Sequence, residues 1–232
     1  MKIAGLITLL AAPLAAQEFT PPAGCEAYLT VQKRDCEVDH HFRCAGDPAG
    51  HQQRASFNET QMTYLGTIDA ETQWVISHRV PYNFTEELEP NPTERASFST
   101  LLETGKDAYD FETVSAQVGT TRYVGSDTLT GRTVTIDGVT LEETNFQITA
   151  SDSSGAMLWQ SEGTEYISRV WRMFLAGQST VTTPTDTFET DSRPMQFITA
   201  GEAGFLSLEP KFGCDILMSA APVMQEYSHD NL

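Results

Sequence analysis

The stretch from Cys25 to Cys44, which reads CEAYLTVQKRDCEVDHHFRC, limits the fold of this chain more than any other part of the sequence. Apolar residues recur at every second position from Ala27 to Val31, and the pattern returns from Val38 to Phe42. A period of two residues is typical of half-buried β-strands. With Arg34-Asp35 as a two-residue turn, the stretch predicts an antiparallel hairpin.

This hairpin brings two distant cysteines together. Its register places Cys25 directly opposite Cys44 on one face, where opposed Cβ atoms lie about 4.5–5.5 Å apart, near disulfide range. The chain has four cysteines. We therefore predict a Cys25–Cys44 disulfide, which leaves Cys36 to pair with Cys214.

The adjacent histidines raise the question of a metal site, and the strand pattern argues against one. His40 and His41 point to opposite faces of a strand, so they cannot share an ion. The histidines and cysteines also lack the spacing of a zinc site. A site that joins His40 to His51 or His78 across strands is the open alternative. We expect His40 in the core opposite Leu29, His41 in solvent, and neither a metal nor a cofactor.

One short helix is expected near residues 92–104. Asn91 is a suitable N-cap, Pro92 fits the first helical position, and Glu94 completes a capping-box pattern. Gly105 is a typical helix stop. The apolar stripe of this segment is narrow, so the helix is expected to cover one end or one face of a sheet.

The rest of the chain favours strands joined by short turns. Asp137-Gly138 is typical of a type I′ hairpin turn, and the apolar pattern changes phase near Glu142-Glu143, which predicts a β-bulge. Residues 164–175 fit a strand or an amphipathic helix, and the regular turn spacing favours a strand. Residues 81–92 read as a loop, and two short strands are expected around residues 201–204.

These elements predict a mainly β protein: a single curved antiparallel meander sheet, as a half-barrel or closed barrel, with roughly nine to eleven strands and one short helix. At the level of fold alone, this resembles the curved barrels of bacterial lipoprotein carriers and similar lipid binders. The resemblance implies an interior that holds an apolar molecule. It rests on strand order and compartment, and no sequence motif carries it.

The N-terminus has the order of a secretory signal peptide: Lys2, a short apolar run, and then small residues. We expect a cleaved signal peptide at 1–16, a leader at 17–24, a single β domain at 25–220 and a flexible tail at 221–232. An exported chain with an even number of cysteines is typical of a periplasmic or secreted, disulfide-bonded protein.

The formal net charge of −18 excludes some classes of partner. Such an acidic protein repels phosphate backbones and anionic lipid headgroups, so we expect no nucleic-acid binding and no electrostatic docking to membranes. No later stretch is long and apolar enough for a transmembrane span. We expect a monomer whose partner is an apolar ligand or an envelope protein.

The sequence contains no serine-hydrolase elbow, P-loop or dinucleotide-binding glycine motif. We therefore expect a non-catalytic protein that binds or carries an apolar small molecule or lipid. Aromatic side chains in strand segments either fill the core or line a pocket inside the curved sheet. The candidates for pocket lining are Trp74, Phe146, Trp159, Trp171 and Phe174.

Two alternative functions are open. One is an envelope assembly or interaction protein that uses a sheet edge. The other is an acid hydrolase with two carboxylates, for which the 32 acidic residues offer many pairs.

Overall fold

The computed structural model describes residues 17–214, and these form one antiparallel sheet of thirteen strands with one short α-helix. From one edge, the strand order runs from β12 down to β1 and ends with β13. The strands are β1 (Cys25–Lys33), β2 (Val38–Cys44), β3 (Gln52–Phe57), β4 (Met62–Ile68), β5 (Trp74–Arg79), β6 (Phe84–Leu88), β7 (Lys106–Ser115), β8 (Gly119–Ile136), β9 (Val139–Asp152), β10 (Met157–Ser168), β11 (Met173–Thr182), β12 (Thr187–Asp191) and β13 (Pro194–Ile198). The helices are α1 (Phe98–Thr104) and the 3₁₀ turn η1 (Val80–Tyr82). The predicted class and meander order are confirmed, and the strand count exceeds the prediction.

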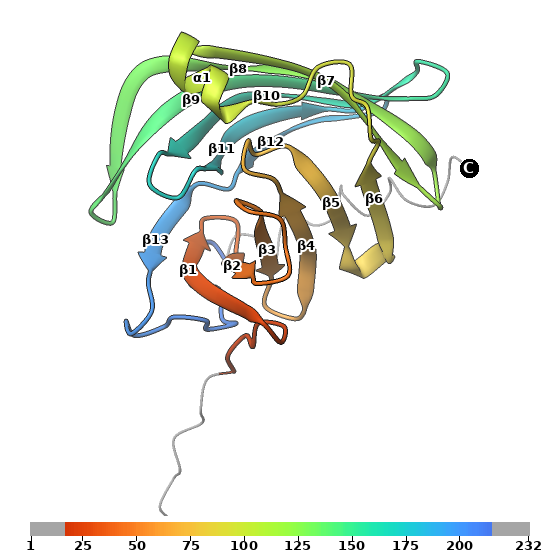
Figure 1. The fold of residues 1–232 in the computed structure, drawn as a ribbon. Coiled ribbons are helices and arrows are strands. Elements are labelled where there is room, and N and C mark those ends of the chain that lie inside the picture. The colour runs from red at the N-terminus through yellow and green to blue at the C-terminus, as the bar shows by residue number, and fades with distance from the viewer. Residues whose placement is uncertain (1–16, 215–232) are drawn as a thin grey trace, which may run out of the picture.

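The sheet curls so that one part of it covers another. Figure 1 shows β7 to β11 as a broad layer above β1 to β6, with α1 beside the upper layer. One face of each strand therefore points into the space between the layers, and we call this the inner face. Trp74 of β5 confirms the arrangement, because its ring contacts the rings of Phe111 on β7 and Tyr123 on β8.

The two edges of the sheet lie next to each other without pairing as strands. Only residues 192–193 separate β12 from β13. The Ser192 amide donates a hydrogen bond to the Gly177 carbonyl of β11, and the Arg34 amide donates one to the Arg193 carbonyl. The structure is thus an open barrel whose gap is spanned by a two-residue link.

Strands β1 to β3 also bury their outer face. Phe19 packs there against the ring of His40, 5.1 Å away, and against Phe42 and Phe57. Leu206 and Leu208 lie against the same cluster. The N-terminal segment and the stretch before Cys214 therefore act as a second layer over this part of the sheet.

Both predicted disulfides are present, Cys25–Cys44 and Cys36–Cys214. Cys25 pairs directly with Cys44 across β1 and β2, as the alternation predicted. Cys36 has a positive φ of 59° and lies in the loop after β1, from which it bonds to the end of the C-terminal segment.

The predicted register inside the first hairpin is wrong by one residue. A β-bulge between Ala27 and Leu29 shifts the pairing, so Leu29 faces His41 instead of His40. Residues 34–37 form the connection, which is longer than a two-residue turn. His41 is therefore buried on the inner face, at 6% exposure, and the expectation that it lies in solvent is wrong. His40 is fully buried, as expected.

The helix is shorter than predicted and has a different cap. Ser97 is the N-cap, with its side chain accepting a hydrogen bond from the Thr100 amide. Glu94 instead forms a β-bridge with Asp110, because the chain before the helix is extended along β7. Gly105 ends the helix at φ 81°, as predicted.

Other strand predictions have mixed outcomes. Asp137 and Gly138 both have positive φ, 46° and 78°, as a type I′ turn requires. The register of β8 and β9 shifts where a bulge was expected, but the extra residues lie on β8, between Leu129 and Thr133. Residues 164–175 belong to two strands and their turn.

The segment read as a loop at 81–92 contains β6, since its alternating Phe84 and Glu86 pair with β5. Of the two strands expected around residues 201–204, only the first exists, as β13. The second is reduced to a single bridge between Glu18 and Ser207.

The disulfides differ in the length of chain they close. The pairs are separated by 19 and 178 residues. In the chain-entropy account, replacing both cysteines of a pair by alanine lowers the free energy of unfolding by about 3 kcal/mol for the shorter loop and about 5 kcal/mol for the longer one. Urea unfolding of the two double variants measures this order, and a larger loss for Cys25→Ala/Cys44→Ala would contradict it.

Candidate functional site

A continuous stripe of large and acidic side chains runs along the inner face of β7 and β8. The inward positions of β7 are Phe111, Tyr109 and Asp107, and their direct partners on β8 are Tyr123, Gly125 and Asp127. Gly125 is required here because a Cβ would lie 2.6 Å from the Tyr109 ring and its hydroxyl. One end of the stripe is therefore aromatic and the other acidic.

The aromatic end gathers five rings from four strands. Phe111 and Tyr123 stack at 5.2 Å, and Trp74 meets both of them edge-on. Trp159 of β10 lies 6.0 Å from Tyr123, and Tyr109 lies 5.9 Å from Phe111. We call these residues the aromatic cluster. Such edge-on and stacked pairs are mutually stabilising.

A buried carboxylate fixes the position of this cluster. Glu86 of β6 is 4% exposed, and its Oε1 accepts hydrogen bonds from the Tyr123 hydroxyl at 2.8 Å and the Thr113 hydroxyl at 2.9 Å. Burial, with the nearby Glu86 charge, raises the pKa of Tyr123. Tyr123 therefore stays protonated and donates to Glu86, which holds its ring against Trp74.

The acidic end contains three carboxyl groups, which we call the interior acid cluster: Asp107, Asp127 and Glu165. Asp107 and Asp127 are 6% and 7% exposed and are direct partners across β7 and β8. Glu165 of β10 points to the same face, because it pairs with Thr144, which itself pairs with Leu129 two residues from Asp127.

Burial changes the charge of these acids. It raises the pKa of Asp127 to about 7, with a further contribution from the charge of Asp107. Burial also raises the pKa of Glu165 to about 8, where Asp127 adds to the effect and Arg54 opposes it. Both carboxyls therefore hold protons over much of the neutral range.

A compensated ionic cluster lies on the facing strands β1 to β3. Lys33 contacts Glu37 at 2.7 Å, and Asp35 and Asp39 at 3.7 Å each. Burial opposes ionisation of Asp39, but the positive charges of Lys33 and Arg54 lower its pKa to about 2. This cluster is therefore charged and internally paired, unlike the interior acid cluster.

A cavity of about 10 Å³ lies beside this ionic cluster. Its lining includes Asp39, His41 and Arg54, and Asp39 Oδ1, His41 Nε2 and Arg54 Nε lack hydrogen-bond partners there. The volume matches at most one water molecule. The space is therefore too small for an organic ligand.

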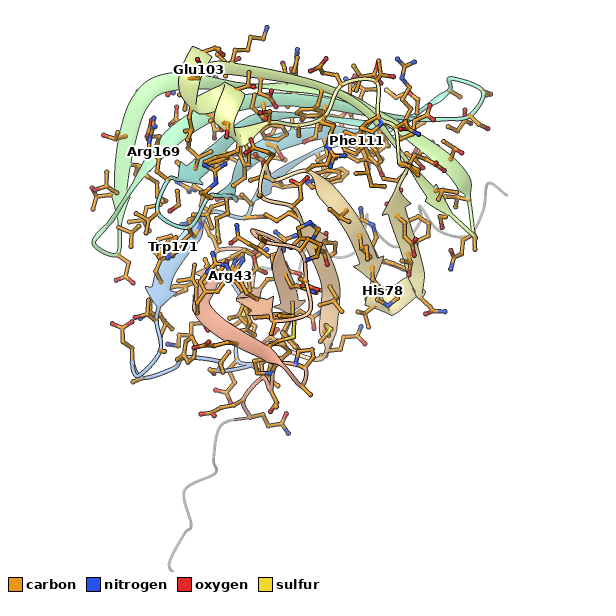
Figure 2. The ribbon with its side chains drawn as sticks, in the orientation of Figure 1. Arg43, His78, Glu103, Phe111, Arg169 and Trp171 are labelled. Atoms are coloured by element: carbon orange, nitrogen blue, oxygen red, sulfur yellow. A yellow bond between two sulfur atoms is a disulfide. The ribbon has the colours of Figure 1, made fainter. Side chains whose placement is uncertain are left out.

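The five aromatic residues predicted to line a pocket fall into three groups. Trp74, Phe146 and Trp159 meet around Phe111 and Tyr123. Trp171 packs against Phe197 at 5.3 Å, and Phe174 packs against Phe98 at 5.7 Å. Figure 2 shows Trp171 and Phe111 in different parts of the curled sheet.

His40 and His41 lie on opposite faces of β2, as the alternation predicted. His40 Nδ1 lies 3.0 Å from the Thr30 hydroxyl on the outer face, whereas His41 is beside Tyr28 on the other face. Within residues 17–214, the single group of clustered metal-ligand atoms is Cys36, Glu59 and Cys214. Its two sulfurs are joined in a disulfide, so they are not available as thiolates.

Comparison with models of protein families, with curated proteins and with solved structures found no match. Residues 17–214 contain no helix that could cross a membrane. The two disulfides are typical of proteins from an oxidising, exported environment.

Sequence reasoning missed most of the site. The segment KDAYDFETVS alternates from Asp107 to Thr113 and could have revealed the inward set of β7. Glu86 lay in a segment read as a loop. Asp127 and Glu165 could not be separated from the other acids of the chain, because their burial depends on the register of β8, β9 and β10 and on the curl of the sheet.

The buried titrating groups predict a stability maximum in mildly acidic solution. Burial lowers the pKa of His40 to about 4 and of His41 to about 3, so the unfolded chain binds more protons there below about pH 6.5. Asp127 and Glu165 act oppositely, because the folded chain holds their protons up to about pH 7 and 8. The effects cancel between about pH 4.5 and 6.5.

We therefore expect the free energy of unfolding to fall as the pH drops below about 4, and to fall again as it rises from about 6.5 to 8. Denaturant unfolding across this pH range measures both slopes. Glu165→Gln should flatten the fall above pH 6.5, and Glu162→Gln, on the exposed face of the same strand, should leave it unchanged. An unchanged slope in Glu165→Gln would contradict the assignment.

Proposed function

We propose that this protein is an exported, non-catalytic binding protein that holds a small apolar molecule against the aromatic cluster. The observation that supports this most directly is the position of Trp74. Its ring points inward, onto Phe111 and Tyr123, yet Trp74 remains 39% exposed. An inward ring with free surface is suited to cover a ligand, because burying that surface favours binding.

Neighbouring inward side chains share this property. Tyr109, Phe146 and Trp159 are each partly exposed, although all three belong to the cluster around Phe111 and Tyr123. Aromatic side chains provide large contact areas at low cost in conformational entropy. Because Glu86 orients Tyr123, the platform is ordered before a ligand arrives, which favours affinity.

The surroundings of the cluster favour a small molecule over a long acyl chain. Beyond Tyr109, the next inward positions are the carboxyl groups of Asp107 and Asp127. A hydrocarbon chain laid along the stripe would contact these polar groups and remove water from them, which costs free energy. The ligand is therefore a compact apolar body about the size of one or two rings.

Export to the periplasm or the outside of the cell is part of this proposal. The apolar N-terminal run with its small-residue end supports a signal peptide. The two disulfides support an oxidising compartment. Detection of the chain in an envelope fraction, beginning at Gln17, tests this part.

A carboxylate-dependent hydrolase is the second candidate. The observation in its favour is that Asp127 and Glu165 lie on the same inner face and burial raises the pKa of each, as expected of a general acid. Hydrolysis of nitrophenyl glycosides that disappears in both Asp127→Asn and Glu165→Gln would support it.

The binding proposal predicts a specific effect of Trp74. Titration with the neutral fluorescent probe N-phenyl-1-naphthylamine should show saturable binding, because its rings can pack on the aromatic cluster. Trp74→Ala should weaken binding by between about threefold and tenfold, the value of an aromatic pair.

Trp171→Phe is the matched control, because Trp171 packs against Phe197 away from the cluster. It should bind the probe as the unaltered protein does. Absence of saturable binding, or equal losses in the two variants, would refute the aromatic cluster as the binding site.

A further inference from the structure

We propose that the ligand is an organic cation, in which a protonated amine is joined to the apolar ring held by the aromatic cluster. This inference rests on the proposed function above and specifies its ligand class. It follows from the acids that continue the same stripe. The ring would lie against the partly exposed rings of Tyr109 and Phe146, and the amine would reach the interior acid cluster.

The spacing of the stripe fits one small molecule. Phe111, Tyr109 and Asp107 occupy alternate positions of one strand, and Tyr109 lies between the rings and the acids. Tyr109 is two residues from Asp107, about 7 Å along a β-strand, and Phe146 is the direct partner of Asp127. A ring held at Tyr109 and Phe146 therefore places an amine on one to three carbon atoms within reach of the acids. The Tyr109 ring is placed to contact the cation on the way.

The acids of this cluster lack an internal counter-ion. None of Asp107, Asp127 and Glu165 forms an ion pair in the part of the chain that the structure describes. Arg54 is the cation that acts on Glu165, but the charge that acts most strongly on Arg54 is Asp39. Asp107 accepts one hydrogen bond, from the Ser97 amide at 2.8 Å.

Thr144 provides an independent sign of a missing partner. Its side chain is fully buried, and Oγ1 has no hydrogen-bond partner. It is the direct partner of Glu165 across β9 and β10, so both side chains leave the sheet on the same side. A buried hydroxyl without a partner is costly, and a ligand that donates to it relieves this cost.

An ammonium group suits these acceptors better than a metal ion. It has three N–H donors, which match Asp127, Glu165 and the Thr144 hydroxyl oxygen. The three carboxyl groups do not form a cluster of mutually close ligand atoms, since the single such group in residues 17–214 is at Cys36 and Cys214. The net charge of −18 also attracts cations toward the protein.

Proton release gives the proposal a second readout. Glu165 is faced by Asp127 from β8, Tyr109 from β7 and Arg54 from β3. Binding of an ammonium group beside these groups lowers the pKa of the carboxyls, so protons held by Asp127 and Glu165 leave at neutral pH. A neutral ligand of the same shape releases none.

The test is calorimetric titration of the full chain at pH 7 with three probes of one shape: 1-naphthylmethylamine, 1-naphthylmethanol and 1-naphthylacetate. We expect the amine to bind at least about tenfold more tightly than the alcohol, and the acetate to bind most weakly. Titration in buffers of different ionisation enthalpy should show proton release with the amine alone.

Variants test the aromatic site and the preference for a cation separately. Glu165→Gln should reduce the preference for the amine over the alcohol, and Glu162→Gln, on the exposed face, should preserve that preference. Trp74→Ala should weaken amine and alcohol alike. Equal binding of amine and alcohol, still dependent on Trp74, would overturn the cation and keep the aromatic site. No binding of any probe would refute both.

Discussion

The structure depends on one constraint: a single antiparallel sheet with no second sheet to pack against must bury one face against itself. The thirteen-stranded sheet curls so far that its two edge strands, β12 and β13, are consecutive in the chain and only two residues apart. The same curl brings the Trp74 ring of β5 against rings of β7 and β8. The Cys36–Cys214 disulfide fixes the C-terminal segment over the outer face of the first strands. The curl therefore decides which side chains share the interior.

The interior that results contains buried polar and charged groups, and the charged ones are of two kinds. Around Lys33 the charges are paired, and paired charges keep Asp39 ionised. Around Asp127 and Glu165 the acids face one another, so burial leaves them holding protons. A buried charge is stable when it is paired with an opposite charge, whereas a buried acid without a nearby cation becomes neutral by holding its proton. This contrast locates the candidate site.

Glu86 links the fold to that site. Strand β6 is short and pairs with β7 at only two positions, yet it contributes the carboxylate that orients Tyr123. The aromatic cluster draws Trp74, Tyr123 and Trp159 from strands that are distant in sequence. The aromatic cluster therefore exists only when the whole sheet has curled.

Local alternation in the sequence determined the mainly β class, the type I′ turn at Asp137-Gly138 and the Cys25–Cys44 pair, because side chains of a strand change face at each residue. It could not determine the bulge beside Tyr28, which shifted Leu29 onto His41 and buried that histidine. Nor could it show that Asp127 and Glu165 share a buried face, because that face depends on the register of β8, β9 and β10 and on the curl that covers it. Only the tertiary structure determines which acids are buried and which aromatic rings remain partly exposed, and these two properties define the candidate site.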